Sequence, residues 1–145
     1  MNTKSILIGL AAGDHLAVDV MGYEYEKAGD RQDLNWLKSD LAVQAGTWSG
    51  KVRKAFFTTT ELRRFREDVE ALVRTKKGEA RLEPMEPYVA LKLSGDGTGV
   101  LEVSGVAFDS VGGVNALAFN WTEDIASAED LVRQLKIVEK AFPPR

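Results

Sequence analysis

Apolar residues recur at helical spacing in two segments of the chain. The first stripe consists of Leu62, Phe65, Val69, Leu72 and Val73. Residues three and four apart share one face of a helix, so this stripe is typical of an amphipathic helix. Thr58 and Glu61 stand just before it in the spacing of a capping box. Lys76-Lys77-Gly78 follows it, and cations with a glycine favour a helix end.

A second stripe lies near the C-terminus and contains Leu131, Leu135, Val138 and Phe142. Ser127, with Asp130 three residues later, is the expected start of this helix. Pro143-Pro144 is the expected end, because proline cannot continue a helix.

Most other apolar residues alternate with polar ones, which is the period of half-buried strands. The alternating sets are Leu16, Val18 and Val20; Leu37, Leu41 and Val43; Val89, Leu91 and Leu93; Leu101 and Val103; and Leu117, Phe119 and Trp121. Residues 5–13 read as one more, buried strand. Glycines at 46, 95–99 and 112–113 supply turns, and Asp96-Gly97 is typical of a hairpin.

These elements predict an α+β protein with about eight strands in the order ββββα-ββββα. Short links between strands imply antiparallel pairing. The expected architecture is one twisted antiparallel sheet with both helices packed on one face. No linker divides the chain, so residues 1–145 are expected to form a single domain.

The composition is ordinary for a globular protein, with 44% hydrophobic and 28% charged residues and a net charge of −3. The charge is unevenly distributed. Residues 14–40 hold seven acids and three bases, whereas residues 51–77 hold nine bases and four acids. Such a bipolar chain can be steered toward a charged partner. The apolar N-terminal run is too short for a membrane span and the chain lacks cysteine, so we expect a cytoplasmic protein that does not bind membranes.

No catalytic motif emerges from the titratable residues. The chain has one histidine, His15, beside Asp14, and no G-x-S-x-G elbow for a serine nucleophile. The acid pairs at 30 and 33 and at 123 and 124 are explained by caps and turns. We therefore predict no enzyme activity, no catalytic residue, no cofactor and no metal site.

The basic stretch from Lys51 to Lys77 carries Phe56 and Phe57 and invites comparison with nucleic-acid-binding proteins. Such modules usually have a strongly basic domain or a recognisable motif. This chain has a sequence pI near 5.3. The sequence therefore predicts no nucleic-acid partner.

Aromatic residues beside acids suggest a protein-binding surface instead. Trp36 alternates with the apolar residues of its strand and lies near Asp33 and Asp40, and Trp48 opens the next strand. Tryptophan is a common anchor of protein interfaces. We predict Asp33, Trp36, Asp40 and Trp48 as partner-binding residues. The alternative is that loops or a second copy of the chain cover this face.

Several segments resemble the WapI family of bacterial immunity proteins. They are Leu34-Asn35-Trp36-Leu37, Trp48-Ser49-Gly50, the helix after Thr58 to Gly78-Glu79-Ala80, Tyr88 to Ser94, Gly95-Asp96-Gly97-x-Gly99, Leu101-Glu102-Val103-Ser104-Gly105, Gly113-x-Asn115, Leu117-x-Phe119 and Phe142-Pro143. The resemblance covers roughly residues 33–143, and residues 1–30 carry little of it. It implies a protein that neutralises the effector domain of a cognate secreted polymorphic toxin.

Two further functions remain open from the residues alone. One is a small-ligand-binding or enzymatic domain that uses a sheet pocket. The other is a structural or regulatory homo-oligomer. For the immunity function, we expect the acid-rich segment to face a basic toxin cleft, because opposite charges accelerate association.

Overall fold

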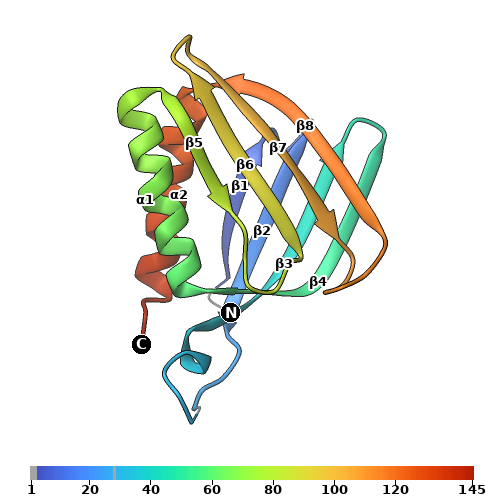
Figure 1. Ribbon diagram of the computed structural model, residues 1–145. Coiled ribbons are helices and arrows are strands. Elements are labelled where there is room, and N and C mark those ends of the chain that lie inside the picture. The colour runs from blue at the N-terminus through green and yellow to red at the C-terminus, as the bar shows by residue number, and fades with distance from the viewer. Residues whose placement is uncertain (1–2, 28) are drawn as a thin grey trace.

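The computed structural model describes residues 3–27 and 29–145 (Figure 1). The first half comprises β1 (Lys4–Gly9), β2 (His15–Tyr23), β3 (Trp36–Ala45), β4 (Trp48–Thr58) and α1 (Thr59–Thr75), with a short 3-10 helix at Asp33–Asn35. The second half comprises β5 (Lys77–Leu82), β6 (Val89–Asp96), β7 (Val100–Phe108), β8 (Ala116–Asp124) and α2 (Ala126–Ala141). The α+β class and the order ββββα-ββββα are confirmed.

The strands form two sheets rather than one, which corrects the expected architecture. One sheet has the order β1-β2-β3-β4 and the other β5-β6-β7-β8, and all neighbouring strands are antiparallel. The two sheets face each other (Figure 1). The physical reason is burial, since the inward residues of both sheets lie in one core and two sheets packed face to face cover each other's apolar faces. The 17 residues of α1 separate β4 from β5, at the point where the chain passes from the first sheet to the second.

The helices close one side of this sandwich instead of covering the outer face of a sheet. α1 packs against α2 and along β5, while α2 packs along β1 (Figure 1). The inner faces of the sheets already bury each other, so the open side between β1 and β5 is where apolar helix stripes find cover. The large apolar residues that the helices bury are Leu62, Phe65, Val69, Leu72, Leu131, Leu135 and Val138. They join the strands' inward residues in one core.

The start of α1 follows the sequence expectation, whereas the start of α2 does not. The Thr58 hydroxyl accepts a hydrogen bond from the Glu61 amide, and Glu61 accepts one from the Thr58 amide, which completes the capping box. α2 begins at Ala126, whose amide donates to Oδ1 of Asp124 over 2.8 Å. The chain turns directly from β8 into α2, so Ser127 already lies within the first turn and is not the N-cap.

The predicted hairpin at Asp96-Gly97 is confirmed. β6 ends at Asp96 and β7 begins at Val100. The Asp96 carboxylate accepts hydrogen bonds from the amide and hydroxyl of Thr98. These bonds hold the pKa of Asp96 below its usual range, and Gly97 adopts φ 93°, which suits glycine.

A charged cluster joins the two helices. Arg66 contacts Glu139 at 2.6 Å and Glu70 at 2.7 Å, and Arg63 contacts Glu139 at 2.9 Å. The hydrogen bond from Arg66 holds the pKa of Glu139 below its usual range. Because Arg66 is largely shielded from solvent, these contacts are screened less than ordinary surface pairs.

Arg145 clamps the long loop that connects β2 to β3. Its guanidinium stacks 3.7 Å from the ring centroid of Tyr23 and donates to the carbonyls of Tyr25 and Leu34. The Arg145 amide also donates to Oδ1 of Asn35, a buried side chain that bonds to Thr59 at the start of α1. These bonds fix the loop against the sandwich.

Candidate protein-binding surface

The four predicted partner-binding residues do not form one cluster. Trp36 pairs with Thr58 and Trp48 pairs with Ala45, so the two tryptophans lie at opposite ends of the β3–β4 hairpin. Nine residue steps at about 3.3 Å each separate these ends by about 30 Å. Trp36 is half-buried, whereas the Trp48 side chain is 74% exposed. The structure thus distinguishes two surfaces that the sequence did not separate.

Trp48 lies at an end of the sandwich formed by the β1–β2 loop and the β3–β4 hairpin (Figure 1). We call Leu10, Asp14 and Trp48 the loop-end surface. Oδ1 of Asp14 accepts a hydrogen bond from the Gly46 amide over 2.8 Å, which ties the loop to the hairpin. Leu10 is 71% exposed. Trp48 was predicted from the sequence, whereas Leu10 was not, because the apolar run around Leu10 gives no sign that the strand ends at Gly9.

His15 has a structural role at the same end, as expected for a turn histidine. Its Nδ1 lies 3.0 Å from the Leu10 carbonyl and 2.9 Å from the Gly13 carbonyl, so Nδ1 carries the proton and donates to them. The neighbouring Asp14 carboxylate bonds to Gly46 instead. The two side chains therefore serve the turn separately and do not form a catalytic relay.

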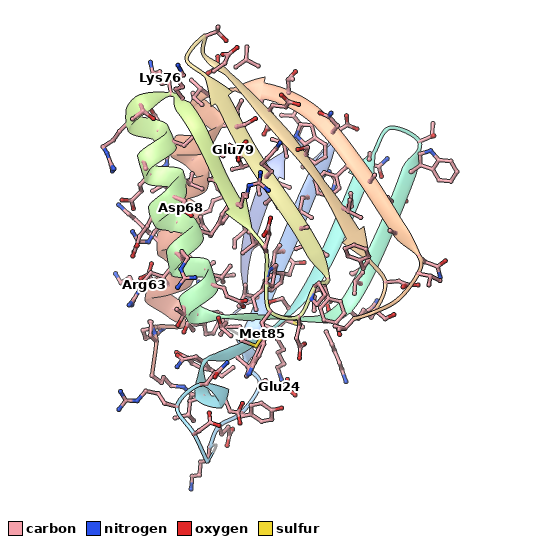
Figure 2. The ribbon with its side chains drawn as sticks, viewed as in Figure 1. Glu24, Arg63, Asp68, Lys76, Glu79 and Met85 are labelled. Carbon is pink, nitrogen blue, oxygen red and sulfur yellow. The ribbon has the colours of Figure 1, made fainter. Side chains whose placement is uncertain are left out.

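At the opposite end, Asp33 lies in the 3-10 helix of the β2–β3 loop. The Asp33 amide donates to Oδ1 of Asp30 over 2.8 Å, so the 30–33 acid pair is a local cap. Figure 2 shows Met85 beside this loop. The Met85 amide donates to Glu61, whose other oxygen caps α1. Both carboxylate oxygens of Glu61 are thus occupied by backbone amides, although the residue lines a cavity here.

Asp40 lies in the middle of β3 on the outer face of the first sheet, directly opposite Asp19 of β2. Like charges at opposite positions of neighbouring strands destabilise a sheet. Asp19 accepts a hydrogen bond from Ser5 over 2.6 Å, and Asp40 faces a bulge of β4 where the Lys54 amide lies 3.4 Å from its Oδ1. The two carboxylates therefore lie side by side on this face, while Arg53 and Lys54 of β4 lie on the other side of Asp40.

Asp40→Asn is expected to raise the free energy of unfolding by about 0.2–1 kcal/mol at low salt, since it removes this repulsion. Urea denaturation measures the change. Asp19→Asn should have a similar effect. The double variant should gain less stability than the sum of the two single variants, because both substitutions remove the same repulsion. A gain that is unchanged in high salt would contradict an electrostatic origin.

The second acid pair, Glu123 and Asp124, is separated by the pleat of β8. Glu123 points into the sandwich and Asp124 points out. Burial raises the pKa of Glu123, and the nearby indole N–H of Trp121 offsets part of the rise. Both Oε2 of Glu123 and Nε1 of Trp121 are nevertheless buried, and neither has a hydrogen-bond partner among the described residues. These two carboxylates therefore do not converge on one reacting atom.

Two cavities open beside β8. One is a groove of about 240 Å³ between β4 and the β7–β8 end, lined by apolar residues such as Leu41, Val52 and Leu117 and by the charged residues Lys51 and Asp109. The other, of about 230 Å³, is lined by Leu10, Glu123 and Asp130, among others.

Within residues 3–27 and 29–145, no three His, Cys, Asp or Glu side chains gather as metal ligands would. No helix of that part is long and apolar enough to cross a membrane.

Comparison with known proteins adds one strong match. The model of the immunity protein WapI-like family matches residues 7–143. This match starts well before residue 33, so residues 7–30 belong to the family pattern, contrary to the sequence expectation. A solved "CdiA-CT/CdiI toxin and immunity complex from Enterobacter cloacae" is 10% identical and covers 83% of this chain and 97% of that chain. Its TM-score of 0.43 does not establish a common fold. No curated protein matches the chain.

Proposed function

The chain belongs to the immunity protein WapI-like family, and we propose that it is an immunity protein that neutralises a protein toxin by binding alone. The inhibitor would occlude the toxin's effector domain in the cytoplasm of the cell that makes both proteins. No step of this inhibition requires a cofactor or a reaction catalysed by the chain.

The loop-end surface carries this proposal. Trp48 and Leu10 hold large apolar side chains in solvent, at 74% and 71% exposure, on two connections joined by the Asp14–Gly46 hydrogen bond. Exposed apolar anchors on rigid turns lose little conformational freedom on binding. Tryptophan in particular contributes strongly at interface centres. Asp14 adds a charge beside the two apolar anchors.

Binding without catalysis is supported by how the titratable groups are used. His15 donates to turn carbonyls, Asp30 caps a 3-10 helix, and Glu61 accepts from two backbone amides. His15, Asp30 and Glu61 are thus engaged in holding the backbone, and Glu123 points away from its neighbour Asp124. General acid–base catalysis requires such a group to reach a substrate proton.

The β2–β3 loop and the outer face of β3 give a second candidate surface, formed by Asp33, Trp36 and Asp40. Asp40 lies beside Asp19 on this face, and this acid pair would favour a toxin with a basic cleft. Charge complementarity acts mainly on the association rate. Reversal of Asp33 and Asp40 to lysine would therefore slow association in low salt if the toxin approaches this face.

The proposal predicts a toxin gene beside the gene of this chain, and the test uses the effector domain of that toxin. Cells that express the toxin should grow only when the chain is co-expressed, and calorimetry with an inactivated toxin should give a fixed stoichiometry. Residual toxin activity should fall linearly with added chain until that stoichiometry is reached. Neutralisation of excess toxin by a small amount of the chain would show turnover and contradict binding alone.

A further inference from the structure

The four edge strands of the two sheets differ in how their free backbone groups are covered. α2 lies along β1, and the Gln134 side chain pairs with both backbone groups of Leu7: its Oε1 accepts from the amide over 2.6 Å, and its Nε2 donates to the carbonyl over 3.1 Å. α1 packs along β5 (Figure 1). Both edges on the helix side are therefore closed to a further strand.

A bulge protects the edge of β4 from pairing with a further strand. Its register with β3 shifts between Val52 and Ala55, where Arg53 and Lys54 together oppose the single residue Asp40. Lys54 adopts φ 61°, in the left-handed region. A bulge with charged residues bends an edge strand and discourages further pairing. β4 thus resists the addition of a strand.

β8 has neither a covering helix nor a bulge. It pairs with β7 over nine residues without a register shift, and β7 is its single neighbour in the sheet. Its sequence, ALAFNWTED, contains no lysine, arginine or proline, and its two charged residues, Glu123 and Asp124, lie at its C-terminal end. Residues 116–122 therefore form a regular, uncharged edge that can accept another strand.

The ladder shows which β8 residues offer free backbone groups. The Asp109 amide donates to the Asn115 carbonyl, and the Ile125 amide donates to the Gly99 carbonyl, at the two ends of the β7–β8 pairing. Bonded and non-bonded pairs alternate in an antiparallel ladder. Odd-numbered β8 residues therefore bond to β7, and the amides and carbonyls of residues 116, 118, 120, 122 and 124 point to the open edge.

The surroundings of β8 indicate what a strand added there must carry. Near Leu117, the groove of about 240 Å³ is lined in part by Leu41, Val43 and Val52, which could contact apolar side chains of an added strand. At the other end, Glu123 has a buried carboxylate oxygen without a hydrogen-bond partner among the described residues. A lysine or arginine of the added strand opposite Glu123 would supply the missing positive charge.

We propose that an extended segment of the toxin docks as a fifth strand on β8, with apolar residues facing the groove and a basic residue beside Glu123. This inference rests on the proposed immunity function and extends it to a second part of the interface. The two parts are continuous, because Leu10 of the loop-end surface and Glu123 line the same cavity.

A second copy of the chain fits this edge less well. The two-fold antiparallel arrangement that uses all nine residues of β8 would place Leu117 of each copy opposite Glu123 of the other. Each carboxylate would then face an aliphatic side chain on the inner side of the strand, where burial of an unpaired charge is costly. A toxin strand with a basic residue at that position avoids this cost.

Asn120→Pro tests the proposal, with Asn120→Ala as the matched control. Both variants remove the outward side chain, but proline also removes an edge amide while leaving the ladder to β7 intact. Asn120→Pro should weaken binding of the inactivated toxin domain by about tenfold or more, because an interstrand hydrogen bond is lost and the ring occupies the partner's place. Asn120→Ala should bind within about twofold of the parent chain.

Two measurements keep the test decisive if proline impairs folding. Hydrogen exchange on the unmodified chain should show the amides of Ala118, Asn120 and Thr122 becoming protected when the toxin domain binds. Glu123→Lys should weaken binding by about tenfold, whereas Glu123→Gln should have a smaller effect.

Toxin binding without protection of the amides of Ala118, Asn120 and Thr122 would overturn the β8 proposal and leave the immunity function intact. A dimer that Asn120→Pro dissociates, with toxin affinity unchanged, would assign the edge to a second copy and also overturn it. Absence of any toxin binding would instead refute the proposed function.

Discussion

Replacement of Phe65 by alanine is expected to lower the free energy of unfolding by about 3–5 kcal/mol. The Phe65 side chain is only 2% exposed and lies on the α1 face that closes the side of the sandwich. Its removal would leave a cavity between helices and sheets that rigid neighbouring strands cannot fill. Urea denaturation followed by circular dichroism measures the loss.

Arg64→Ala is the matched control, because Arg64 is the neighbouring residue on the exposed face of α1. Alanine and arginine both favour helices, so this variant should stay within about 0.5 kcal/mol of the parent chain. Equal losses for the two variants would mean that α1 does not bury this face. Such a result would contradict the packing of α1 against the sandwich.

Trp48→Ala is expected to weaken binding of the inactivated toxin domain by about 2 kcal/mol or more, which corresponds to about thirtyfold. The loss should appear mainly as faster dissociation, because a buried aromatic anchor acts after the encounter. Stability should change little, since the side chain is 74% exposed in the free chain. Biolayer interferometry resolves the association and dissociation rates.

Trp36→Ala serves as the control at the other end of the same hairpin. Trp36 lies about 30 Å from Trp48 along the strands and is half-buried. If Trp36→Ala speeds dissociation while Trp48→Ala does not, the toxin docks near Asp33 and Asp40. The loop-end surface would then be the wrong choice, although the immunity function would stand.

The cap of α1 and the strand patterns could be predicted from the sequence, because they depend on residues close together in the chain. The capping box of Thr58 and Glu61 formed as expected, since its hydrogen bonds join residues three positions apart. The period-two pattern at Leu16, Val18 and Val20 correctly marked a strand with one buried face. The predicted start of α2 was wrong because the chain turns into the helix directly after β8, so that Ile125 is the N-cap and Ser127 already lies in the first turn.

Only part of the candidate surface could be predicted from the sequence. Trp48 stood out as an aromatic residue at the start of a strand, and its exposure supports that choice. Leu10 did not, because the sequence continues an apolar run through a position where the chain turns. The free edge of β8 was also hidden, since nothing local shows which strands lie at the edges of a sheet.

The sequence by itself determined the α+β class, the element order and the faces that each element buries, because periodicity and capping act between residues close in the chain. Only the tertiary structure decided that the strands divide into two facing sheets and that the helices close one side. It also decided that Trp36 and Trp48 lie apart and that β8 keeps an open edge. These features depend on contacts between distant segments, and alternation specifies which face of a strand is buried but not which neighbour covers it.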